Sequence, residues 1–189
     1  MKTALHCARF LLRLDQPHSQ VTEAELSLLL TYARGASTVV ELGCYEGRTS
    51  VALALETAGS VISVDPFTPG RLGLCYGRLI ASTFRRRARA LNLRLVRGCS
   101  HEVAGTFDRS IDLLFVDADR TYEAACRDWA GWLPKVVLGG YVAAHDCRVA
   151  PNSAVHLGSM RYYDECLVSR SDLEQVAAVD SLVIFRKRH

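Results

Sequence analysis

The chain of 189 residues lacks the features that mark several large protein classes. It has no apolar run long enough to cross a bilayer, no internal repeat and no low-complexity segment. Its formal net charge is only +3, which is too small to indicate a nucleic-acid or membrane partner. The apolar positions of residues 1–14 are interrupted by His6, Arg9 and Arg13, so this segment lacks the core of a secretory signal.

The seven cysteines do not form a recognisable framework. They are odd in number, scattered along the chain, and include no C-x-x-C pair. This pattern argues against a set of disulfides and against a cysteine-rich zinc site. We therefore expect a reducing, cytoplasmic location.

The composition is that of an ordinary globular domain, with 49% hydrophobic and 23% charged residues. A chain of this length can bury one sizeable core. We expect one domain over residues 1–189, in which residues 1–20 form an N-terminal helix or arm and residues 21–189 form the core.

The most informative stretch is VVELGCYEGRT, residues 39–49. An apolar run ends near Glu41, a loop follows in which Gly43 and Gly47 lie four residues apart, and a helical pattern covers residues 48–58. This order predicts the strand, turn and helix that open a nucleotide-binding α/β domain. The glycines would let a ligand approach the backbone, and the helix would offer unpaired N–H groups.

The dinucleotide fingerprint G-x-G-x-x-G is missing from this turn. The pattern present is acid-x-Gly-x-x-x-Gly. An NAD-dependent oxidoreductase with the same kind of sheet is therefore disfavoured, and it stays open as an alternative.

Apolar segments alternate with helical patterns along the chain, which is typical of a parallel sheet covered on both faces. A capping box at Thr22 and Glu25 predicts the start of a first helix, and Gly35 predicts its end. Further strands are predicted at residues 61–65, 94–97, 111–116 and 141–144, and further helices at residues 74–91, shortly after residue 98, and at residues 121–132.

The end of the chain has a different pattern. Gly139-Gly140 predicts a turn that leads into the strand at 141–144. Segments 175–179 and 182–185 flank Asp180-Ser181, which predicts a closing antiparallel hairpin, with one bent strand as the alternative.

Polar residues end most of the predicted strands: Glu41, Asp65, Asp117 and the pair His145-Asp146. Ligands of open α/β sheets bind outside the carboxyl ends of the strands, so these side chains are expected to share one site. Asp65 can accept hydrogen bonds from both hydroxyls of a ribose, or it is a solvated strand-end acid. Glu41 could accept from a ligand ammonium, or it could hold the glycine loop.

The motif acid-x-Gly-x-x-x-Gly resembles the first motif of the class I S-adenosylmethionine-dependent methyltransferases. The segment LFVDADRTYE at 114–123, the Gly139-Gly140 pair, His145-Asp146 and the tail at 179–187 resemble the small O-methyltransferase branch of that family. The resemblance extends over residues 39–187. It implies an α/β, three-layer Rossmann-like fold with a mostly parallel seven-stranded sheet and a C-terminal antiparallel hairpin.

The resemblance also implies S-adenosylmethionine as the cofactor and a set of residues that contact it. Some of these contacts would be made by backbone atoms, and Ser100 and Asp119 could instead only cap helices. The implied residues are Glu41, Gly43, Cys44, Tyr45, Gly47, Thr49, Asp65, Pro66, Cys99, Ser100, Asp117 and Asp119.

Methyl transfer requires an aligned acceptor and removal of its proton. Asp117 and Asp146, predicted at the ends of adjacent strands, could together bind Mg²⁺ or another divalent cation. Metal-dependent relatives carry Asn at the position of Cys147, and a thiol is a poor ligand for Mg²⁺. In a scheme without metal, His145 would be the general base, unless it is a structural histidine.

We therefore expect a methyltransferase that acts on a hydroxyl of a small molecule, with His145, Asp117 and Asp146 as catalytic residues. A non-catalytic module that binds S-adenosylmethionine is the alternative from another class. No nucleic-acid or membrane partner is expected. A homodimer could form through the N-terminal arm and Tyr162-Tyr163, while Trp129 and Trp132 are interpreted as packing residues.

Overall fold

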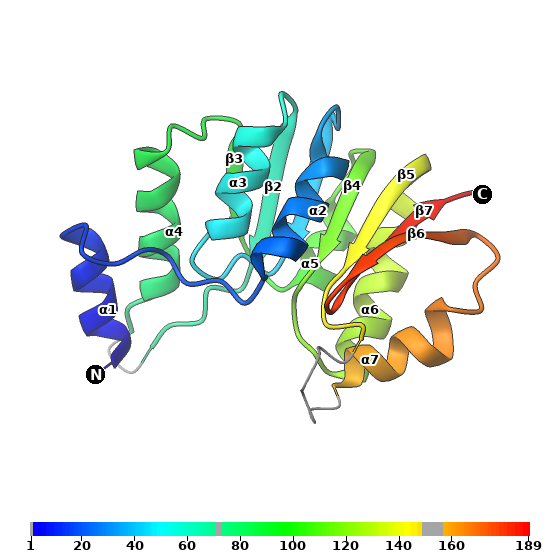
Figure 1. The fold of residues 1–189 in the computed structure, drawn as a ribbon. Helices are drawn as coiled ribbons and strands as arrows, with labels where there is room; N and C mark the ends of the chain where they lie inside the picture. The colour runs from blue at the N-terminus through cyan, green and yellow to red at the C-terminus, as the bar shows by residue number, and fades with distance from the viewer. Residues whose placement is uncertain (1, 71–72, 149–156) are drawn as a thin grey trace.

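The computed structural model describes residues 2–70, 73–148 and 157–189. One seven-stranded sheet runs through the molecule in the order β3-β2-β1-β4-β5-β7-β6. The first five of these strands pair in parallel, and β7 pairs antiparallel with both β5 and β6. Helices cover both faces of the sheet (Figure 1). The predicted three-layer fold and closing hairpin are therefore confirmed.

The strands have the following bounds: β1 Thr38–Leu42, β2 Ser60–Asp65, β3 Leu93–Arg97, β4 Ile111–Val116, β5 Val136–Ala144, β6 Leu173–Val179 and β7 Leu182–Lys187. The α-helices are α1 Lys2–Leu11, α2 Glu23–Ala33, α3 Arg48–Glu56, α4 Tyr76–Arg87, α5 Ser100–Thr106, α6 Tyr122–Trp132 and α7 Gly158–Tyr162. A 3₁₀ turn at Leu133–Lys135 follows α6, and a π-helical turn at Tyr163–Leu167 follows α7. Among the described helices, none is long and apolar enough to cross a bilayer.

Each face of the sheet has its own hydrophobic core. On one face, Trp129 and Trp132 of α6 are buried among residues of β1, β4 and β5, which confirms that they are packing residues. On the other face, Leu29 of α2 and Leu53 of α3 are buried with Phe115 of β4. Every residue of β1 is buried, as expected for a central strand covered on both sides.

The capping box at the start of α2 forms as predicted. Thr22 Oγ1 accepts from the Glu25 N–H at 3.2 Å, and the Thr22 N–H donates to Glu25 Oε2 at 2.8 Å. The helix ends at Ala33, and Gly35 follows with a φ of 78°.

The prediction of a turn at Gly139-Gly140 was wrong, because both glycines lie inside β5. Ile111 of β4 pairs with Val136 of β5, and Leu113 pairs with Tyr141. Two residues along β4 therefore correspond to five along β5. The strand is therefore irregular at this point. Gly139 has a φ of 79°, a conformation that glycine adopts without strain.

The N-terminal segment forms a helix, α1, that packs against α4. Cys7 and Phe10 contact Ile80 in a small separate cluster. Arg87 of α4 donates to the carbonyls of Phe10 and Leu11 at 2.9 and 2.8 Å, which satisfies groups left open at the end of α1.

Tyr162 is buried against Tyr122 and Trp129, so its ring is not available as a surface for a second subunit.

Candidate active site

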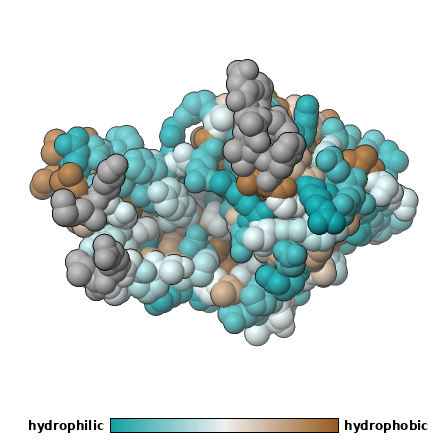
Figure 2. All heavy atoms as spheres, turned by 90° about the horizontal axis from the view of Figure 1, so that it is seen from below, coloured by the Kyte–Doolittle hydropathy of each residue, from teal (hydrophilic) through white to brown (hydrophobic). Residues whose placement is uncertain are grey.

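A cleft of about 730 Å³ opens beyond the carboxyl ends of β1, β2 and β4. Figure 2 shows the molecule from below relative to the view of Figure 1, and the surface is hollowed near its middle. This is the edge at which parallel α/β sheets bind ligands.

The glycines of the turn after β1 were predicted to make room for a ligand, but the structure gives a different reason for them. Gly43 has a φ of 93°, and a Cβ there would lie 2.0 Å from the carbonyl oxygen of Asp117. Gly47 has a φ of 82°, and a Cβ there would lie 3.0 Å from the Cβ of Ala81 in α4. Both positions need glycine because other parts of the protein, rather than a ligand, approach so closely.

Asp65 at the end of β2 lines the cleft and holds this turn in shape. Its Oδ2 accepts from the N–H groups of Cys44 and Tyr45, both at 2.9 Å, and its Oδ1 accepts from the N–H of Phe67 at 2.6 Å. A carboxylate offers about four lone-pair sites. Three are used inside the protein, so one remains for a ligand.

Glu41 lies behind the cleft and not on its wall. The residue is 1% exposed, and its Oε2 accepts hydrogen bonds from the hydroxyls of Ser50 and Ser63. Its Oε1 is buried without a hydrogen-bond partner among the described residues. Burial raises the pKa of Glu41 to about 7. This position differs from the predicted contact with a ligand ammonium.

The structure places the other predicted cofactor residues on the wall of the cleft. The exception is Gly47, which packs against Ala81 of α4. Those that line the cleft are Gly43, Cys44, Tyr45, Thr49, Asp65, Pro66, Cys99, Ser100, Asp117 and Asp119.

Two of these residues also have internal partners. Ser100 is the first residue of α5 rather than its N-cap, and its hydroxyl donates to Asp128. Asp119 accepts from the N–H of Thr121 at 2.9 Å, just before α6, so it does stabilise the start of that helix.

Parts of the cleft wall were not predicted from the sequence. Thr3, His18, Ser19 and Gln20 contribute one side, although residues 1–20 carry no binding motif. Their place depends on the docking of α1 against α4, which is a long-range contact. The segment after β2 also contributes Phe67, Thr68 and Gly70 to the cleft wall.

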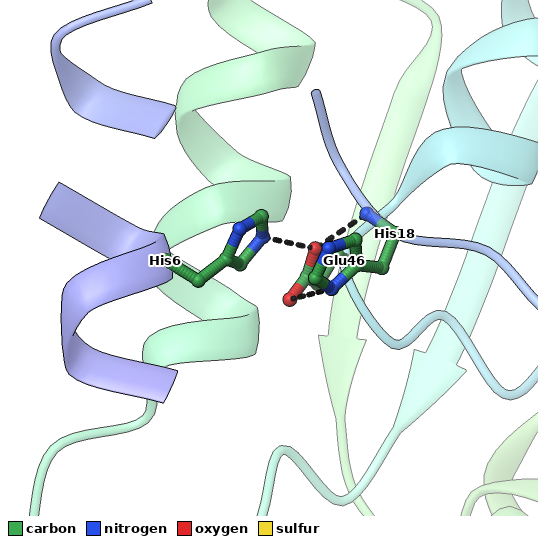
Figure 3. A group of neighbouring side chains, drawn as sticks. All are labelled: His6, His18 and Glu46. Carbon is green, nitrogen blue, oxygen red and sulfur yellow. Dashed lines mark hydrogen bonds and ion pairs between the residues drawn. The ribbon is translucent and has the colours of Figure 1, made fainter. Parts of the chain in front are cut away.

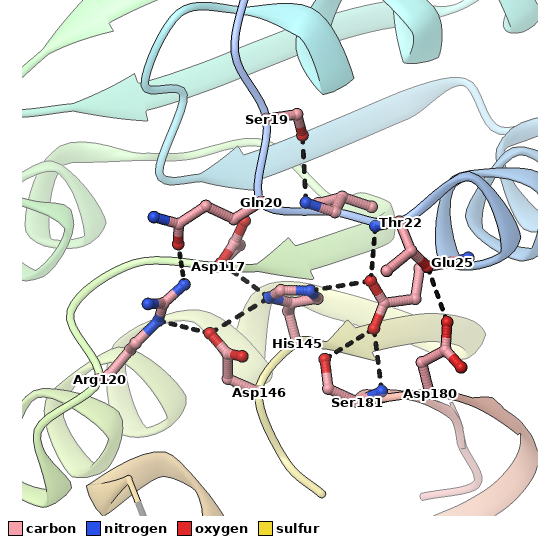
Figure 4. Close-up of polar contacts among 11 residues, drawn as sticks. Ser19, Gln20, Thr22, Glu25, Asp117, Arg120, His145, Asp146, Asp180 and Ser181 are labelled. Atoms are coloured by element: carbon pink, nitrogen blue, oxygen red, sulfur yellow. Dashed lines mark hydrogen bonds and ion pairs between the residues drawn. The ribbon is translucent and has the colours of Figure 1, made fainter. Parts of the chain in front are cut away.

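His145 is buried among three carboxylates (Figure 4). Its Nδ1 lies 3.0 Å from Asp117 Oδ1 and 3.3 Å from Asp146 Oδ2, and its Nε2 lies 3.2 Å from Glu25 Oε2. Burial alone would lower the pKa of His145, but hydrogen bonds to the three acids outweigh it and raise the pKa to about 12. The ring is then an imidazolium at neutral pH. In this arrangement it has no lone pair with which to act as the predicted general base.

The predicted pair of metal ligands also differs from expectation. Asp117 and Asp146 do approach each other, but the imidazolium of His145 lies between them. The guanidinium of Arg120 forms an ion pair with Asp146, so two cations already compensate the acids. The thiol of Cys147 is buried, and burial raises its pKa, so it offers no thiolate. One ligand atom each of Asp117, His145 and Asp146 lie within 4.8 Å of one another, so a divalent cation would bind here only by displacing the proton of His145 and the guanidinium of Arg120.

Glu25 joins the helix cap to this cluster, a role that the sequence did not indicate. Its Oε1 accepts from the N–H and the hydroxyl of Ser181 at 2.9 and 2.7 Å, while its Oε2 faces His145. Burial would raise the pKa of Glu25, but these partners lower it to about 2. The carboxylate therefore connects α2, the turn of the hairpin and the end of β5.

Comparison with known proteins agrees with this geometry. The model of a family described as a methyltransferase domain matches residues 40–147. The protein R132 of Acanthamoeba polyphaga mimivirus is 25% identical over 130 residues, which are 64% of this chain and only 56% of that protein.

Two solved structures show the same fold with different named activities. The O-methyltransferase TomG from Streptomyces achromogenes, involved in tomaymycin synthesis and solved with S-adenosylmethionine, has a TM-score of 0.72. It is 18% identical, with 100% of this chain and 91% of that chain covered. An rRNA methylase from Streptococcus thermophilus has a TM-score of 0.64 and 13% identity, with 90% and 98% covered.

The family match extends from β1 to the end of β5 and thus includes the glycine turn, Asp65, Asp117 and His145-Asp146. It covers more than half of the chain. The protein therefore belongs to the family that this methyltransferase-domain model describes.

Proposed function

We propose that this protein transfers the methyl group of S-adenosylmethionine to a hydroxyl of a small molecule. The observation that carries the proposal is the meeting of Asp65, the glycine turn and Asp117 in one cleft at the carboxyl edge of the sheet. The structural similarity to TomG, an O-methyltransferase solved with this cofactor, supports the same conclusion.

Asp65 binds the ribose in this proposal, through the one lone-pair site that its backbone partners leave. It accepts from a single ribose hydroxyl, rather than from both as the sequence suggested. Cys99 and Ser100, at the start of α5, lie on the same cleft and border the adenine.

Asp117 is the catalytic carboxylate of the proposal, since His145 and Asp146 do not line the cleft. Its side chain is 17% exposed, and burial is the main cause that raises its pKa, which makes it a better base than a solvated aspartate. S-adenosylmethionine, when bound, would supply a methyl group that the acceptor oxygen takes up as the sulfur becomes a neutral thioether. The hydroxyl proton passes to Asp117, which His145 holds from behind.

A non-catalytic module that binds the same cofactor is the second candidate. It is favoured by the charge compensation around His145, because a protonated His145 is not a general base and Asp117 and Asp146 already have cationic partners. A panel of phenols, catechols and aliphatic alcohols separates the two candidates. Methyl transfer that is lost in Asp117→Asn supports the enzyme, whereas cofactor binding without transfer to any of them favours the module.

The cofactor proposal is tested by calorimetric titration with S-adenosylhomocysteine. We expect Asp65→Asn to weaken binding by about 1–3 kcal/mol, because the charged acceptor of the ribose hydroxyl is lost. Asp112→Asn is the matched control. Asp112 also accepts from two backbone N–H groups, those of Ser37 and Thr38, but it does not line the cleft.

Equal affinity in wild type and Asp65→Asn would contradict the ribose assignment. Absence of binding to the wild-type protein would contradict the proposed function as a whole.

A further inference from the structure

Three side chains from separate parts of the chain meet beside the glycine turn (Figure 3). They are His6 of α1, His18 from the segment before α2, and Glu46 of the turn itself. One nitrogen of each histidine and a carboxylate oxygen all lie within 4.8 Å of one another. None of these three residues takes part in methyl transfer as proposed above.

We propose that His6, His18 and Glu46 bind a divalent transition-metal ion of the zinc type. His6 Nε2 lies 3.0 Å from Glu46 Oε2, and His18 Nδ1 lies 3.8 Å from Glu46 Oε1. Zinc bonds of 2.0–2.2 Å in a tetrahedral arrangement place neighbouring donors about 3.3 Å apart. The observed separations bracket that value. Two imidazoles and one carboxylate form a common zinc ligand set and leave a fourth position for water.

The surroundings of His6 orient it as a ligand. Its Nδ1 lies 3.2 Å from Asp15 Oδ2, and Arg9 Nε holds the same carboxylate at 3.0 Å. Histidine ligands of metals commonly bond a carboxylate through the other ring nitrogen, which fixes the ring and the tautomer. Here that contact leaves Nε2 directed at Glu46. The Glu46 side chain is only 3% exposed, and a buried carboxylate needs cationic or hydrogen-bonding partners.

Binding requires one local adjustment. The rings of His6 and His18 are stacked, with centroids 3.8 Å apart and planes inclined by 10°, whereas a metal ion must lie close to the plane of each ring. The His18 side chain is 59% exposed and can turn, while its backbone N–H stays on Glu46 Oε2 at 2.6 Å. The proton on His6 Nε2 is released to solvent when that nitrogen binds the ion.

The ion would fasten the N-terminal segment to the glycine turn. His18 and Thr3 line the cofactor cleft. Cys44 and Tyr45, the two residues before Glu46 in the turn, line it as well. A metal held by all three segments therefore stabilises one wall of that cleft. Zinc is accordingly expected to raise the Tm of the wild-type protein, because the assembled site holds the ion more tightly than the separate ligands of the unfolded chain do.

The test is calorimetric titration of zinc into the full chain after treatment with a chelator. We expect zinc affinity to fall at least tenfold in His6→Gln and in His18→Gln, and about 10–100-fold in Asp15→Asn. His189→Gln, which changes an exposed histidine at the C-terminus, serves as the matched control and should bind as the wild type does. Cobalt binding should give the visible absorption of a tetrahedral site, without the charge-transfer band of a thiolate.

Unchanged zinc binding in the His6→Gln/His18→Gln double variant would overturn the proposal. So would zinc binding that is lost only in Asp146→Asn, since that places the ion in the His145 cluster. His18→Gln changes an exposed side chain, so a melt without metal that matches the wild type shows that its loss of zinc is not a loss of folding. Failure of the proposed methyl transfer would leave these titrations unaffected.

Discussion

At the scale of single residues, compensation of buried charge decides what the side chains near the cleft can do. His145 is in contact with the three carboxylates of Glu25, Asp117 and Asp146, which hold it as an imidazolium. The position of His145 at the end of a strand suggested a general base because the sequence does not show which groups contact its ring. Here its partners make it a fixed positive charge that positions Asp117.

Substitution of Glu25 measures how much this charge compensation contributes to stability. Glu25→Gln should lower the free energy of unfolding by about 3–5 kcal/mol at neutral pH, because it leaves a buried imidazolium without one of its partners. The control, Glu23→Gln, lies in the same first turn of α2 but pairs with Arg48 at the surface, so it should cost at most about 1 kcal/mol. Urea denaturation of the three proteins gives both values.

The pH dependence of that difference follows from the pKa of Glu25, which folding lowers from 4.5 to about 2. A lowered pKa means that the contribution is fully present above pH 4.5 and is lost as the pH falls towards 2. The stability gap between wild type and Glu25→Gln should therefore close over this range. A gap that stays constant down to pH 2 would show that the carboxylate of Glu25 is not the group responsible.

At the scale of elements, the turn after β1 depends on how closely the end of β4 approaches it. The carbonyl oxygen of Asp117 occupies the space that a side chain at Gly43 would need. The sequence pattern indicated a glycine turn correctly, but the group that requires the first glycine is the carbonyl of the residue that follows β4. Gly139 differs, because an irregular step in the pairing of β4 and β5 lies where the turn was predicted, and the φ of 79° rather than a close neighbour favours glycine there.

Gly43→Ala should destabilise the protein by about 3 kcal/mol or more, through the positive φ and the contact with Asp117 combined. Gly105→Ala is the matched control. Gly105 lies within α5 with open space around its Cα, so alanine there should stabilise the protein by about 0.5–1 kcal/mol. Chemical denaturation measures both changes, and a Gly43→Ala protein as stable as the wild type would contradict the close approach.

At the scale of the whole molecule, the cofactor cleft is completed by a segment that is distant in sequence. Residues 3 and 18–20 reach the cleft because α1 is docked on α4, and Arg87 holds the end of α1 through two carbonyls and the ring of Phe10. Cofactor binding and the docking of α1 are therefore expected to be coupled.

Arg87→Ala should loosen α1 by about 1–3 kcal/mol, because two hydrogen bonds from a charged donor are lost. The expected result is faster amide hydrogen exchange in α1 and weaker binding of S-adenosylhomocysteine. Arg86→Ala, at the neighbouring exposed position, is the control and should change neither, since among the described residues the Arg86 guanidinium hydrogen-bonds to Thr83 of its own helix and to no residue of α1. Unchanged exchange in Arg87→Ala would show that α1 is held by its apolar contacts alone.

Most of the fold could be predicted from the sequence because its signals are local. The capping box at Thr22, the apolar strands and the hairpin around Asp180 each depend on residues a few positions apart. The same is true of the motif at 39–49 and of the strand-end acids, which predicted the family and most of the cleft. The predicted contact of Glu41 with a ligand differs from its buried position, because burial of a carboxyl group depends on which distant residues pack around it.

The sequence by itself determined the order of strands and helices and the residues that reach the carboxyl edge of the sheet, because periodicity and turn chemistry act over short distances. Only the tertiary structure decided the charge of His145, the position of Glu41 and the meeting of His6 and His18 at Glu46. Glu25 and His145 are 120 positions apart. Protonation and metal affinity depend on such neighbours in space, which no local pattern can reveal.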